Sequence, residues 1–224
     1  MSLKNLSVKN KIPKVLKNKL NNNKIGKIYK KFAKSLSVNE DLIVSVSGGP
    51  DSLALAFLSK IYSIKKKIKV KYYIIDHKLR AESANEAKYI KKILNKFYIN
   101  AEILSWQGKK PKNNIQSLAR AKRFELLLSK AQKFRIKHIL LGHHQGDLFE
   151  NFFIRILRGS GLKGLISLGE KTTLNDVSIL RPLINQKKED LVFISKKVFD
   201  FYVKDPSNND DKFQRVRIRK LLKG

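Results

Sequence analysis

The chain contains no cysteine in its 224 residues. This absence excludes disulfides, thiolate metal sites, iron–sulfur clusters and thiol nucleophiles supplied by the chain itself. Acidic residues are also scarce, because 18 Asp and Glu stand against 49 Lys and Arg, for a formal net charge of +31 at pH 7. A chain with so little negative charge attracts polyanions, of which nucleic acids are the main class.

Long hydrophobic runs are missing as well. No segment approaches the roughly 18 to 20 apolar residues that a membrane-spanning helix needs. The first residues are rich in Lys and Asn and lack the apolar core of a secretory signal. We therefore expect no membrane association and a cytoplasmic protein. The hydrophobic share of 42% is still sufficient for a packed interior, and the length suits one α/β domain with an extension or tail.

The basic residues are of two kinds with different distributions. The 39 Lys are spread over the whole chain, which an AT-rich coding bias would also produce, whereas the 10 Arg all lie between Arg80 and Arg219. Because the guanidinium group matches phosphate with a fixed fork of donors, we expect the Arg positions to be the more specific ones.

Short apolar segments alternate with segments of helical periodicity from residue 41 onward. Strands are predicted at 42–46, 70–75, 101–106, 138–141 and 179–183. Helices are predicted at 25–36, 52–62, 83–97, 115–134, 147–157 and 188–202, with a short one after Asp210. This order predicts an α/β fold with a parallel five-stranded sheet, helices on both faces and a short C-terminal helical tail.

The same pattern suggests three parts: a basic N-terminal extension at 1–40, a central domain at 41–200 and a basic C-terminal tail at 201–224. Two local expectations accompany this division. Residues 83–86 read Ser-Ala-Asn-Glu, which predicts a helix capping box. The four residues Phe152, Phe153, Ile156 and Leu157 recur at helical spacing, which predicts that they lie in the core.

Polar and glycine-rich residues follow three of the predicted strands, at 47–52, 76–80 and 142–147. Because the carboxyl ends of parallel strands meet at one edge of a sheet, these three loops should converge there. Such an edge is where open α/β sheets bind their ligands. The sequence therefore predicts one binding site built from three loops.

The first of these loops consists of Ser47, Gly48, Gly49, Pro50, Asp51 and Ser52. Two glycines let an anion approach the backbone amides, and the following helix points its positive end at the loop. A carboxylate at Asp51 would repel a bare phosphate, but it makes sense if it holds Mg²⁺ that bridges phosphates. The loop lacks the endings of a Walker A or dinucleotide motif. A plain strand-to-helix turn is the alternative, and we favour nucleotide binding.

The Ser-Gly-Gly-x-Asp-Ser pattern resembles the pyrophosphate loop of the N-type ATP pyrophosphatases, which cleave ATP between its α- and β-phosphates. Within that group, later segments resemble the tRNA(Ile)-lysidine synthetases. These segments are 76–83 (Asp-His-Lys-Leu-Arg-Ala-Glu-Ser), 119–124 (Ala-Arg-Ala-Lys-Arg-Phe), 142–150 with its Gly-His-His start, 158–165 (Arg-Gly-Ser-Gly-Leu-Lys-Gly-Leu), 181–183 (Arg-Pro-Leu), 205–208 (Asp-Pro-Ser-Asn) and the Arg-rich tail at 215–219. The resemblance runs from about residue 42 to the end, with the motifs in family order.

This resemblance implies an adenine nucleotide α-hydrolase-like, Rossmann-like domain at 41–200. It also implies an activity. ATP, with Mg²⁺, would adenylate the ring carbonyl oxygen of the wobble cytidine in an isoleucine tRNA with a CAU anticodon. The ε-amine of free lysine would then displace AMP, so that the anticodon reads AUA instead of AUG. The resemblance leaves open whether the protein is a homodimer.

The resemblance and the chemistry of the side chains together suggest roles for particular residues. The loop at 47–52, with Asp76, His77, Arg120 and Arg123, is expected to bind the nucleotide. The expected metal ligands are Asp51 and Asp147, and the expected catalytic residues are Asp51, His143 and Asp147. For tRNA, the candidates are Arg80, Arg158, Arg181, Arg215, Arg217 and Arg219. His143, Asp147 or Glu150 could take the proton of the incoming lysine or attract its ammonium group.

Two alternatives to specific roles are kept. The Arg-rich tail could be a solvated basic face, and Glu150 could simply pair with a basic side chain. One departure from the motif also bears on activity, since Gly146 stands where the resembling enzymes carry the first of two adjacent acids. The competing functions are a tRNA sulfur-transfer enzyme, which the lack of cysteine disfavours, and a catalytically weakened RNA-binding relative.

Overall fold

The computed structural model describes residues 12–79, 81–107, 115–159, 169–204, 210, 212 and 214–221. Its sheet has the order β3-β2-β1-β4-β6-β5. The strands are β1 (Leu42–Val46), β2 (Val70–Asp76), β3 (Ala101–Ser105), β4 (His138–Leu140), β5 (Lys171–Leu174) and β6 (Val177–Leu180). The five expected parallel strands are confirmed, and β5 adds an antiparallel edge strand through a tight hairpin with β6.

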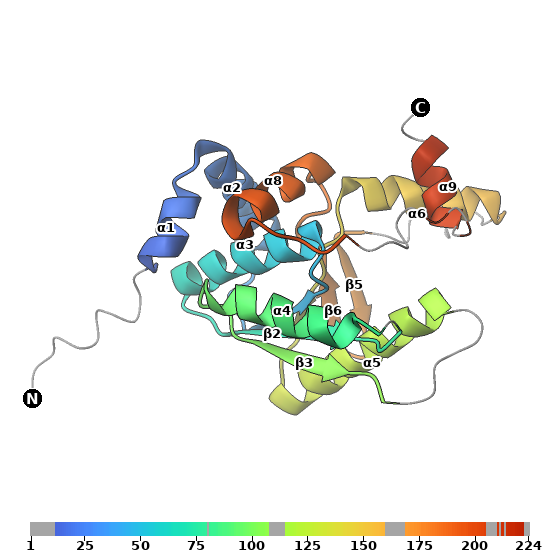
Figure 1. Cartoon of the computed structure of the whole chain (residues 1–224), viewed down its shortest axis with the longest axis horizontal. Helices are drawn as coiled ribbons and strands as arrows, with labels where there is room; N and C mark the ends of the chain where they lie inside the picture. The colour runs from blue at the N-terminus through green and yellow to red at the C-terminus, as the bar shows by residue number, and fades with distance from the viewer. Residues whose placement is uncertain are drawn as a thin grey trace, which may run out of the picture.

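Helices cover both faces of this sheet (Figure 1). They are α1 (Lys14–Leu20), α2 (Asn23–Leu36), α3 (Pro50–Lys66), α4 (Ser83–Asn95), α5 (Ile115–Phe134), α6 (Gln145–Leu157), α8 (Lys188–Phe199) and α9 (Gln214–Leu221). Within the described ranges, no helix combines the length and the apolar character that a membrane crossing requires. The α/β class predicted from the alternation of periods is confirmed.

The central strand β1 shows why both faces must be covered. All five of its residues are buried, and successive side chains point to opposite faces of the sheet. Leu42, Val44 and Val46 join one apolar cluster with α3, α4 and α8. Ile43 joins a second cluster against α5, where Leu127 and Ala131 are buried. A run of apolar residues without alternation is therefore the correct signature of this doubly covered strand.

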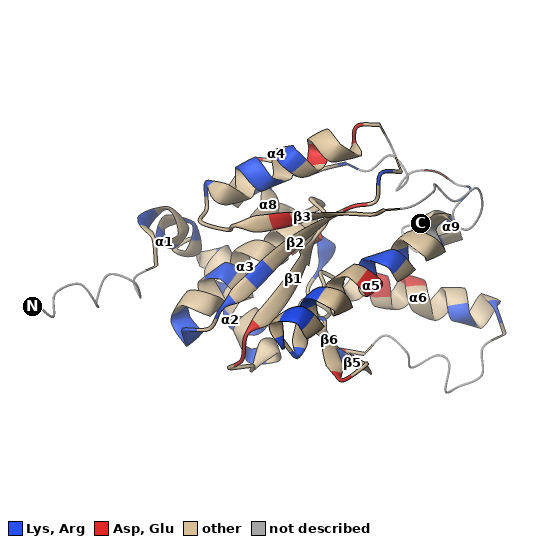
Figure 2. Cartoon of the chain, turned by 90° about the horizontal axis from the view of Figure 1, so that it is seen from below, with Lys and Arg blue, Asp and Glu red and all other residues tan. Residues whose placement is uncertain are grey.

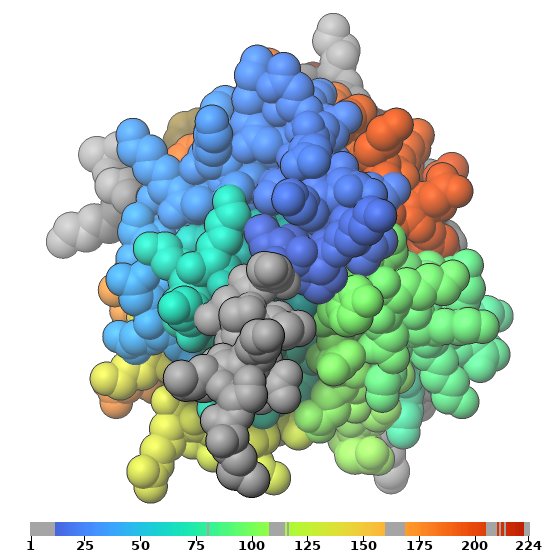
Figure 3. All heavy atoms as spheres, turned by 90° about the vertical axis from the view of Figure 1, so that its left-hand side faces the viewer, coloured from blue at the N-terminus to red at the C-terminus, as the bar shows by residue number. Residues whose placement is uncertain are grey.

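Helices α1 and α2 belong to the first of these clusters. Leu16, Ile25 and Phe32 are fully buried, and the ring of Phe32 meets that of Tyr62 on α3 edge-on at 6.0 Å. Figure 3 shows α1 and α2 continuous with the neighbouring surface of the molecule. The division into an extension at 1–40, a domain at 41–200 and a tail at 201–224 stays a prediction, and the helices of its first part pack into the common core.

Two local expectations were wrong. The apolar stripe of α6 is not in the core, because Phe152, Phe153, Ile156 and Leu157 are 38–66% exposed. Helical spacing identifies an apolar face but not what covers it. The capping box at 83–86 does not form among the described residues 81–86, since Ser83 is the first residue of α4 and the N-cap Glu82 makes no side-chain cap bond.

The strand order reverses direction between β1 and β4, which lie side by side although β2 and β3 come between them in the chain. Such a switch point leaves a crevice beyond the carboxyl ends of the two strands. The glycine-rich loop follows β1 and the Gly-His-His segment follows β4, so the fold brings both to this crevice.

Candidate active site

The loop after β1 is held in a tight turn by its own serines. The hydroxyl of Ser52 accepts a hydrogen bond from Ser47 N at 3.1 Å and donates to Gly49 O at 2.9 Å. Pro50 is the first residue of α3 and Gly49 is its N-cap. Because Pro has no N–H to leave unsatisfied at that position, it starts the helix without cost. The N-terminus of α3 therefore opens directly onto the loop.

Gly48 is required by its surroundings. Its φ is +82°, and a Cβ built there would lie 2.3 Å from Ile90 Cδ1 on α4 and 3.0 Å from Val203 Cγ2. Its carbonyl accepts a hydrogen bond from Val203 N at 2.9 Å. The other glycine that meets the loop is Gly142, where a Cβ would lie 3.1 Å from the carbonyl carbon of Asp51. The backbone after β4 thus packs directly on the loop.

The carboxylate of Asp51 contacts the first residue of α8. Its Oδ2 accepts a bond of 2.6 Å from Lys188 Nζ, whereas its Oδ1 is buried without a hydrogen-bond partner. Helix α8 is fixed to the loop by Ser195 Oγ, which donates to Pro50 O at 2.6 Å. Lys188 was not expected from the sequence, because a lysine at a helix start in a chain with so many lysines carries no visible signal.

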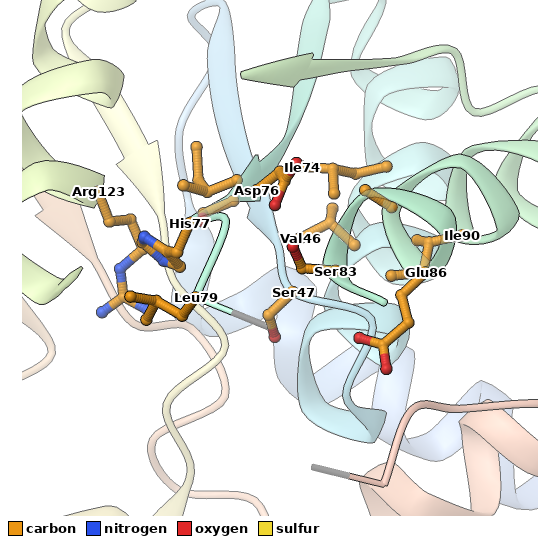
Figure 4. Close-up of a pocket in the computed structure, with 13 residues that line it drawn as sticks. Val46, Ser47, Ile74, Asp76, His77, Leu79, Ser83, Glu86, Ile90 and Arg123 are labelled. Atoms are coloured by element: carbon orange, nitrogen blue, oxygen red, sulfur yellow. The ribbon is translucent and has the colours of Figure 1, made fainter. Parts of the chain in front are cut away.

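A cavity of about 180 Å³ opens beside the loop. Figure 4 shows its walls, with Ser47 at the end of β1, Asp76 and His77 at the end of β2, and Arg123 beside His77. Asp76 is 4% exposed and accepts a hydrogen bond from Lys78 N at 2.9 Å, which closes the turn after β2. The expected nucleotide residues Ser47, Asp76, His77 and Arg123 therefore line one cavity.

Two side-chain nitrogen atoms on this wall of the cavity lack a hydrogen-bond partner. His77 Nδ1 and Arg123 Nε are buried without hydrogen bonds, so a polar ligand in the cavity can satisfy them. Burial, and then the charge of Arg123, lowers the pKa of His77, although Asp76 opposes the shift. Burial together with Arg120 and Arg215 lowers the pKa of Arg123 to about 10, and it remains a cation at neutral pH.

The Gly-His-His segment after β4 forms the N-terminus of α6. Gly146 N donates to His144 Nδ1 at 2.9 Å, and His144 N donates to Asp147 Oδ2 at 2.9 Å. Since Nδ1 accepts, the proton of the neutral ring lies on Nε2. That atom is 3.9 Å from Asp51 Oδ2 and 3.8 Å from Asp147 Oδ2. His144 therefore sits between the two carboxylates expected to bind metal.

Gly146 suits this arrangement of His144. A Cβ at position 146 would lie 2.8 Å from His144 Cε1. The departure from the resembling motif thus does more than remove an acid, because it makes room for the imidazole ring that caps α6.

His143 contacts Arg181, the residue that follows β6. Its Nδ1 accepts a bond of 3.2 Å from Arg181 Nε, and Arg181 Nη1 donates to Gly169 O at 3.0 Å and Thr172 Oγ1 at 2.8 Å. Arg181 is 4% exposed. In this structure it has little surface left for a tRNA phosphate, and it holds His143 instead.

The charges around His143 and Asp147 determine their protonation. Burial lowers the pKa of His143 to about 3, helped by the cations of Arg123, Arg181 and Arg120 and opposed by Asp147. Burial alone would raise the pKa of Asp147, but the pKa is lowered overall by its two histidine neighbours, the His144 N–H bond and Arg215. At neutral pH the pair is therefore an uncharged imidazole beside a carboxylate.

Arg120 and Arg123, three residues apart on α5, lie on one face of the helix as expected. Arg120, Arg215, Asp147 and Arg181 are close enough to influence one another electrostatically. Burial, then Arg215, lowers the pKa of Arg120. The centre thus gathers Arg120, Arg123, Arg181 and Arg215 around one carboxylate, which leaves an excess of positive charge for an anionic ligand.

The remaining tRNA candidates have different surroundings. Arg219 forms two hydrogen bonds with the buried Glu150, at 2.6 and 3.0 Å, so the ion-pair alternative for Glu150 is confirmed. Arg158 is exposed, with Nη2 3.4 Å from Gln214 Oε1. Arg217 is exposed on α9. The remaining candidate, Arg80, lies outside the described residues.

The family model described as the PP-loop domain matches residues 18–223. The chain therefore belongs to the PP-loop domain family, and a PP-loop domain implies that it uses ATP.

The chain is also similar in sequence to curated proteins with a more specific name. The chain is 43% identical over 185 residues to a protein named tRNA(Ile)-lysidine synthase from Orientia tsutsugamushi (strain Boryong), covering 83% of this chain and 42% of that protein. It is 35% identical over 183 residues to a protein of the same name from Bradyrhizobium diazoefficiens, covering 81% of this chain and 51% of that one. The chain thus spans about half the length of the curated relatives that it matches.

Solved structures support the fold alone. The U34-tRNA thiolase NcsA from Methanococcus maripaludis, solved with its [4Fe-4S] cluster, superposes with a TM-score of 0.75 at 17% identity, covering 88% of this chain and 71% of that one. An NMN synthetase from Francisella tularensis superposes with a TM-score of 0.53 at 14% identity, covering 93% and 86% of the two chains.

The two loop glycines allow a matched test of the turn. Gly48→Ala should lower the melting temperature and reduce ATP affinity at least about tenfold, because the new Cβ strains a positive φ and displaces Ile90. Gly49→Ala is the control for the melting temperature, since its φ is −69° and the nearest atom to its Cβ would be Ser47 Oγ at 3.7 Å. Thermal melting of both variants and calorimetric ATP titration of Gly48→Ala measure these effects. Equal melting temperatures of the two variants would contradict this description of the turn.

The pKa of His143 predicts acid sensitivity of the unliganded protein. Between pH 6.5, where a free histidine titrates, and about 3, the unfolded chain binds one proton more than the folded one at this position. Stability from this residue is therefore lost as pH falls below 6.5, by at most about 1.4 kcal/mol per pH unit. Urea unfolding of wild type and His143→Gln between pH 7.5 and 5, run with a chelator, should show a shallower slope for the variant. Parallel slopes would contradict the lowered pKa.

Proposed function

We propose that this chain has tRNA(Ile)-lysidine synthetase activity. ATP would be attacked at its α-phosphorus by the ring carbonyl oxygen of the wobble cytidine in a CAU-anticodon isoleucine tRNA, with diphosphate leaving. The ε-amine of free lysine would then attack the activated ring carbon, and AMP would leave with that oxygen. A cytoplasmic location, where ATP and tRNA are both present, is part of the proposal.

One observation carries this proposal more than any other. The loop at 47–52 and the group formed by His143, Asp147 and the four arginines meet at one sheet edge, where Gly142 packs on Asp51. A loop that grips phosphates is thereby joined to a cationic centre that can hold a second anionic substrate. The relatives in Orientia and Bradyrhizobium carry the name tRNA(Ile)-lysidine synthase, which agrees with a tRNA as this second substrate.

The residues at the loop fit Mg²⁺. Asp51 Oδ1 is a buried acceptor that lacks a donor, and carboxylate oxygen is the ligand that Mg²⁺ prefers. Among the described residues, no three His, Cys, Asp or Glu side chains are grouped to hold a metal. That agrees with a nucleotide-bound ion, which generally takes one or two carboxylates and completes its shell with phosphates and water. Asp51 would hold the ion, which would neutralise charge on the phosphates, whereas Asp147 lies across the His144 ring from it.

The lowered pKa values of His143 and Asp147 make both groups poor general bases at neutral pH, so we assign them other roles. A ring with a pKa near 3, whose Nδ1 already accepts from Arg181, is a weak base at neutral pH. The pKa of Asp147 is lowered as well. We therefore assign Asp147 to attract and orient the lysine ammonium by charge, and His143 to hold the substrates as a neutral hydrogen-bonding ring.

Lys188 gains a role from its position. Its ammonium binds Asp51 at the loop, on a helix that Ser195 anchors to the same loop. When phosphates bind, a lysine so placed can exchange Asp51 for a phosphate oxygen and leave the carboxylate to the metal. The carboxylate of Asp51 would then be paired with Lys188 before ATP binds and with the metal ion after ATP binds.

The alternative of a catalytically weakened RNA-binding relative rests on Gly146, which removes one acid from the site. The structure offers a physical reason for Gly146 in the packing of His144 and leaves Asp51 and Asp147 in place on either side of that ring. We therefore favour the enzyme.

The direct experiment follows incorporation of radiolabelled lysine into a CAU-anticodon isoleucine tRNA transcript with ATP and Mg²⁺. Wild type should incorporate lysine, and Asp51→Asn should lower the rate at least about a hundredfold while tRNA affinity stays unchanged. Asp41→Asn is the control, because Asp41 lies before β1 at the opposite edge and bonds Lys69 N. Wild-type tRNA binding without incorporation would favour the binding protein. Loss of tRNA binding in Asp51→Asn would contradict the role given to Asp51.

Lys188 can be tested against its neighbour Lys187. Lys188→Met should weaken ATP binding roughly tenfold or more, since a charge-assisted bond to phosphate contributes about 1.5–3 kcal/mol. Lys187→Met removes the same charge from an exposed side chain at the helix N-cap and should bind ATP as wild type does. Calorimetric titration with ATP, with and without Mg²⁺, measures this. If both variants lose the same affinity for ATP, the loss reflects the lower net charge of the protein, and Lys188 has no specific contact with phosphate.

A further inference from the structure

Helix α6 presents an apolar stripe to solvent that the site does not use. Phe149, Phe152, Phe153, Ile156 and Leu157 are 51, 40, 38, 45 and 66% exposed. Their spacing places them on one face of the helix, and the rings of Phe152 and Phe153 meet edge-on at 5.7 Å. The buried residues of the helix, Glu150 and Ile154, lie on a neighbouring face. Most large apolar side chains of α6 are therefore exposed, which is the reverse of an ordinary amphipathic helix.

Positive charges lie at the C-terminal end of α6 and on the helix that packs against it. Arg155 and Arg158 lie at the C-terminal end of α6, and α9, which packs against α6, adds the exposed Arg217 and Lys220. The carboxylates of these two helices are Asp147 and Glu150, both on α6, and Glu150 is buried and bonded to Arg219. Figures 1 and 2 both show α6 and α9 side by side. We call this surface of α6 and α9 the aromatic–basic face.

The combination selects one class of partner. An unpaired nucleotide offers a planar base that stacks on an aromatic ring and a phosphate that binds a cation. A base-paired duplex hides its bases and offers phosphates alone. A second copy of this chain, at a formal charge of +31, would bring like charges together at the same face. Charge complementarity therefore favours single-stranded RNA over self-association.

The face is also placed next to the chemistry. Phe149 follows Asp147 by two residues on the same helix, and the N-cap of that helix is His144. From Phe149 to Leu157 the helix rises about 12 Å, roughly the length of three or four stacked nucleotides. RNA bound along the stripe would thus lead directly to the carboxylates at the mouth of the sheet.

We propose that the aromatic–basic face of α6 and α9 binds the unpaired nucleotides that flank the reacting cytidine, through stacking on Phe152 and Phe153 and phosphate contacts from the basic side chains. The inference rests on the proposed function for the identity of the RNA. It extends that function by assigning the surface that recognises a loop as opposed to a duplex.

The test compares an RNA hairpin carrying the CAU anticodon in its loop with a blunt duplex of equal length, both labelled for fluorescence anisotropy. Phe152→Ala and Phe153→Ala should each weaken hairpin binding about tenfold, as expected for lost base stacking, and leave duplex binding unchanged. Phe153→Tyr should restore hairpin affinity, because it keeps the ring. Tyr98→Ala is the control, since Tyr98 is 57% exposed just before β3 at the opposite edge of the sheet.

Several outcomes would overturn the inference. Unchanged hairpin affinity in the Phe variants, or equal loss for hairpin and duplex, would remove the stacking role. A wild-type dimer in sedimentation that dissociates in Phe152→Ala would assign the face to a second copy. The lysine assay separates the two claims. Wild type that incorporates lysine with Phe variants that bind the hairpin normally refutes only this inference, whereas loop-selective binding without incorporation refutes only the enzyme.

Discussion

The close approach of Gly48 to Ile90 and Val203 fixes the phosphate loop in space. A carbonyl hydrogen bond to Val203 N and contact with Ile90 leave no room for a side chain at position 48. Three separate segments, the end of β1, helix α4 and the chain after α8, are thereby joined at one turn. Gly142 joins β4 to the same turn from the other side. The position of Asp51 depends on this packing, because Asp51 follows Gly48 by three residues.

The residues around that turn carry an excess of positive charge, which favours the binding of anions. Four arginines approach one another at the centre. Burial lowers the pKa values of three of them, Arg120, Arg123 and Arg181, and it also makes the repulsion between the cations costly. Two phosphate-bearing substrates would relieve that repulsion. In the proposed reaction, the neutral His143 would donate a hydrogen bond to a substrate, and the ionised Asp147 would attract the ammonium group of lysine.

Much of this arrangement was visible in the sequence, for identifiable reasons. Buried parallel strands leave uninterrupted apolar runs, and glycines at strand ends mark tight turns, so β1, its loop and the convergence at the sheet edge were predicted correctly. The sequence did not show which groups particular side chains bond in the folded protein. Arg181 and Arg219 read like the exposed arginines beside them, yet they bond His143 and Glu150 inside the fold. Lys188 was hidden among many lysines, and the stripe of α6 looked like core because periodicity does not reveal what lies opposite a face. The antiparallel strand β5 was not predicted, because all its residues are exposed and it therefore lacks an apolar pattern.

In the proposed reaction, the loop delivers the innermost phosphate of ATP to an RNA oxygen. A decisive experiment incubates the protein with a CAU-anticodon tRNA and ATP labelled at the α-phosphate, without lysine, and follows label on the RNA. Label should accumulate on the RNA, unlabelled lysine should then release it as AMP, and label placed on the γ-phosphate should appear only in diphosphate. Release of inorganic phosphate from the γ-position, or label that never reaches the RNA, would contradict the proposed reaction.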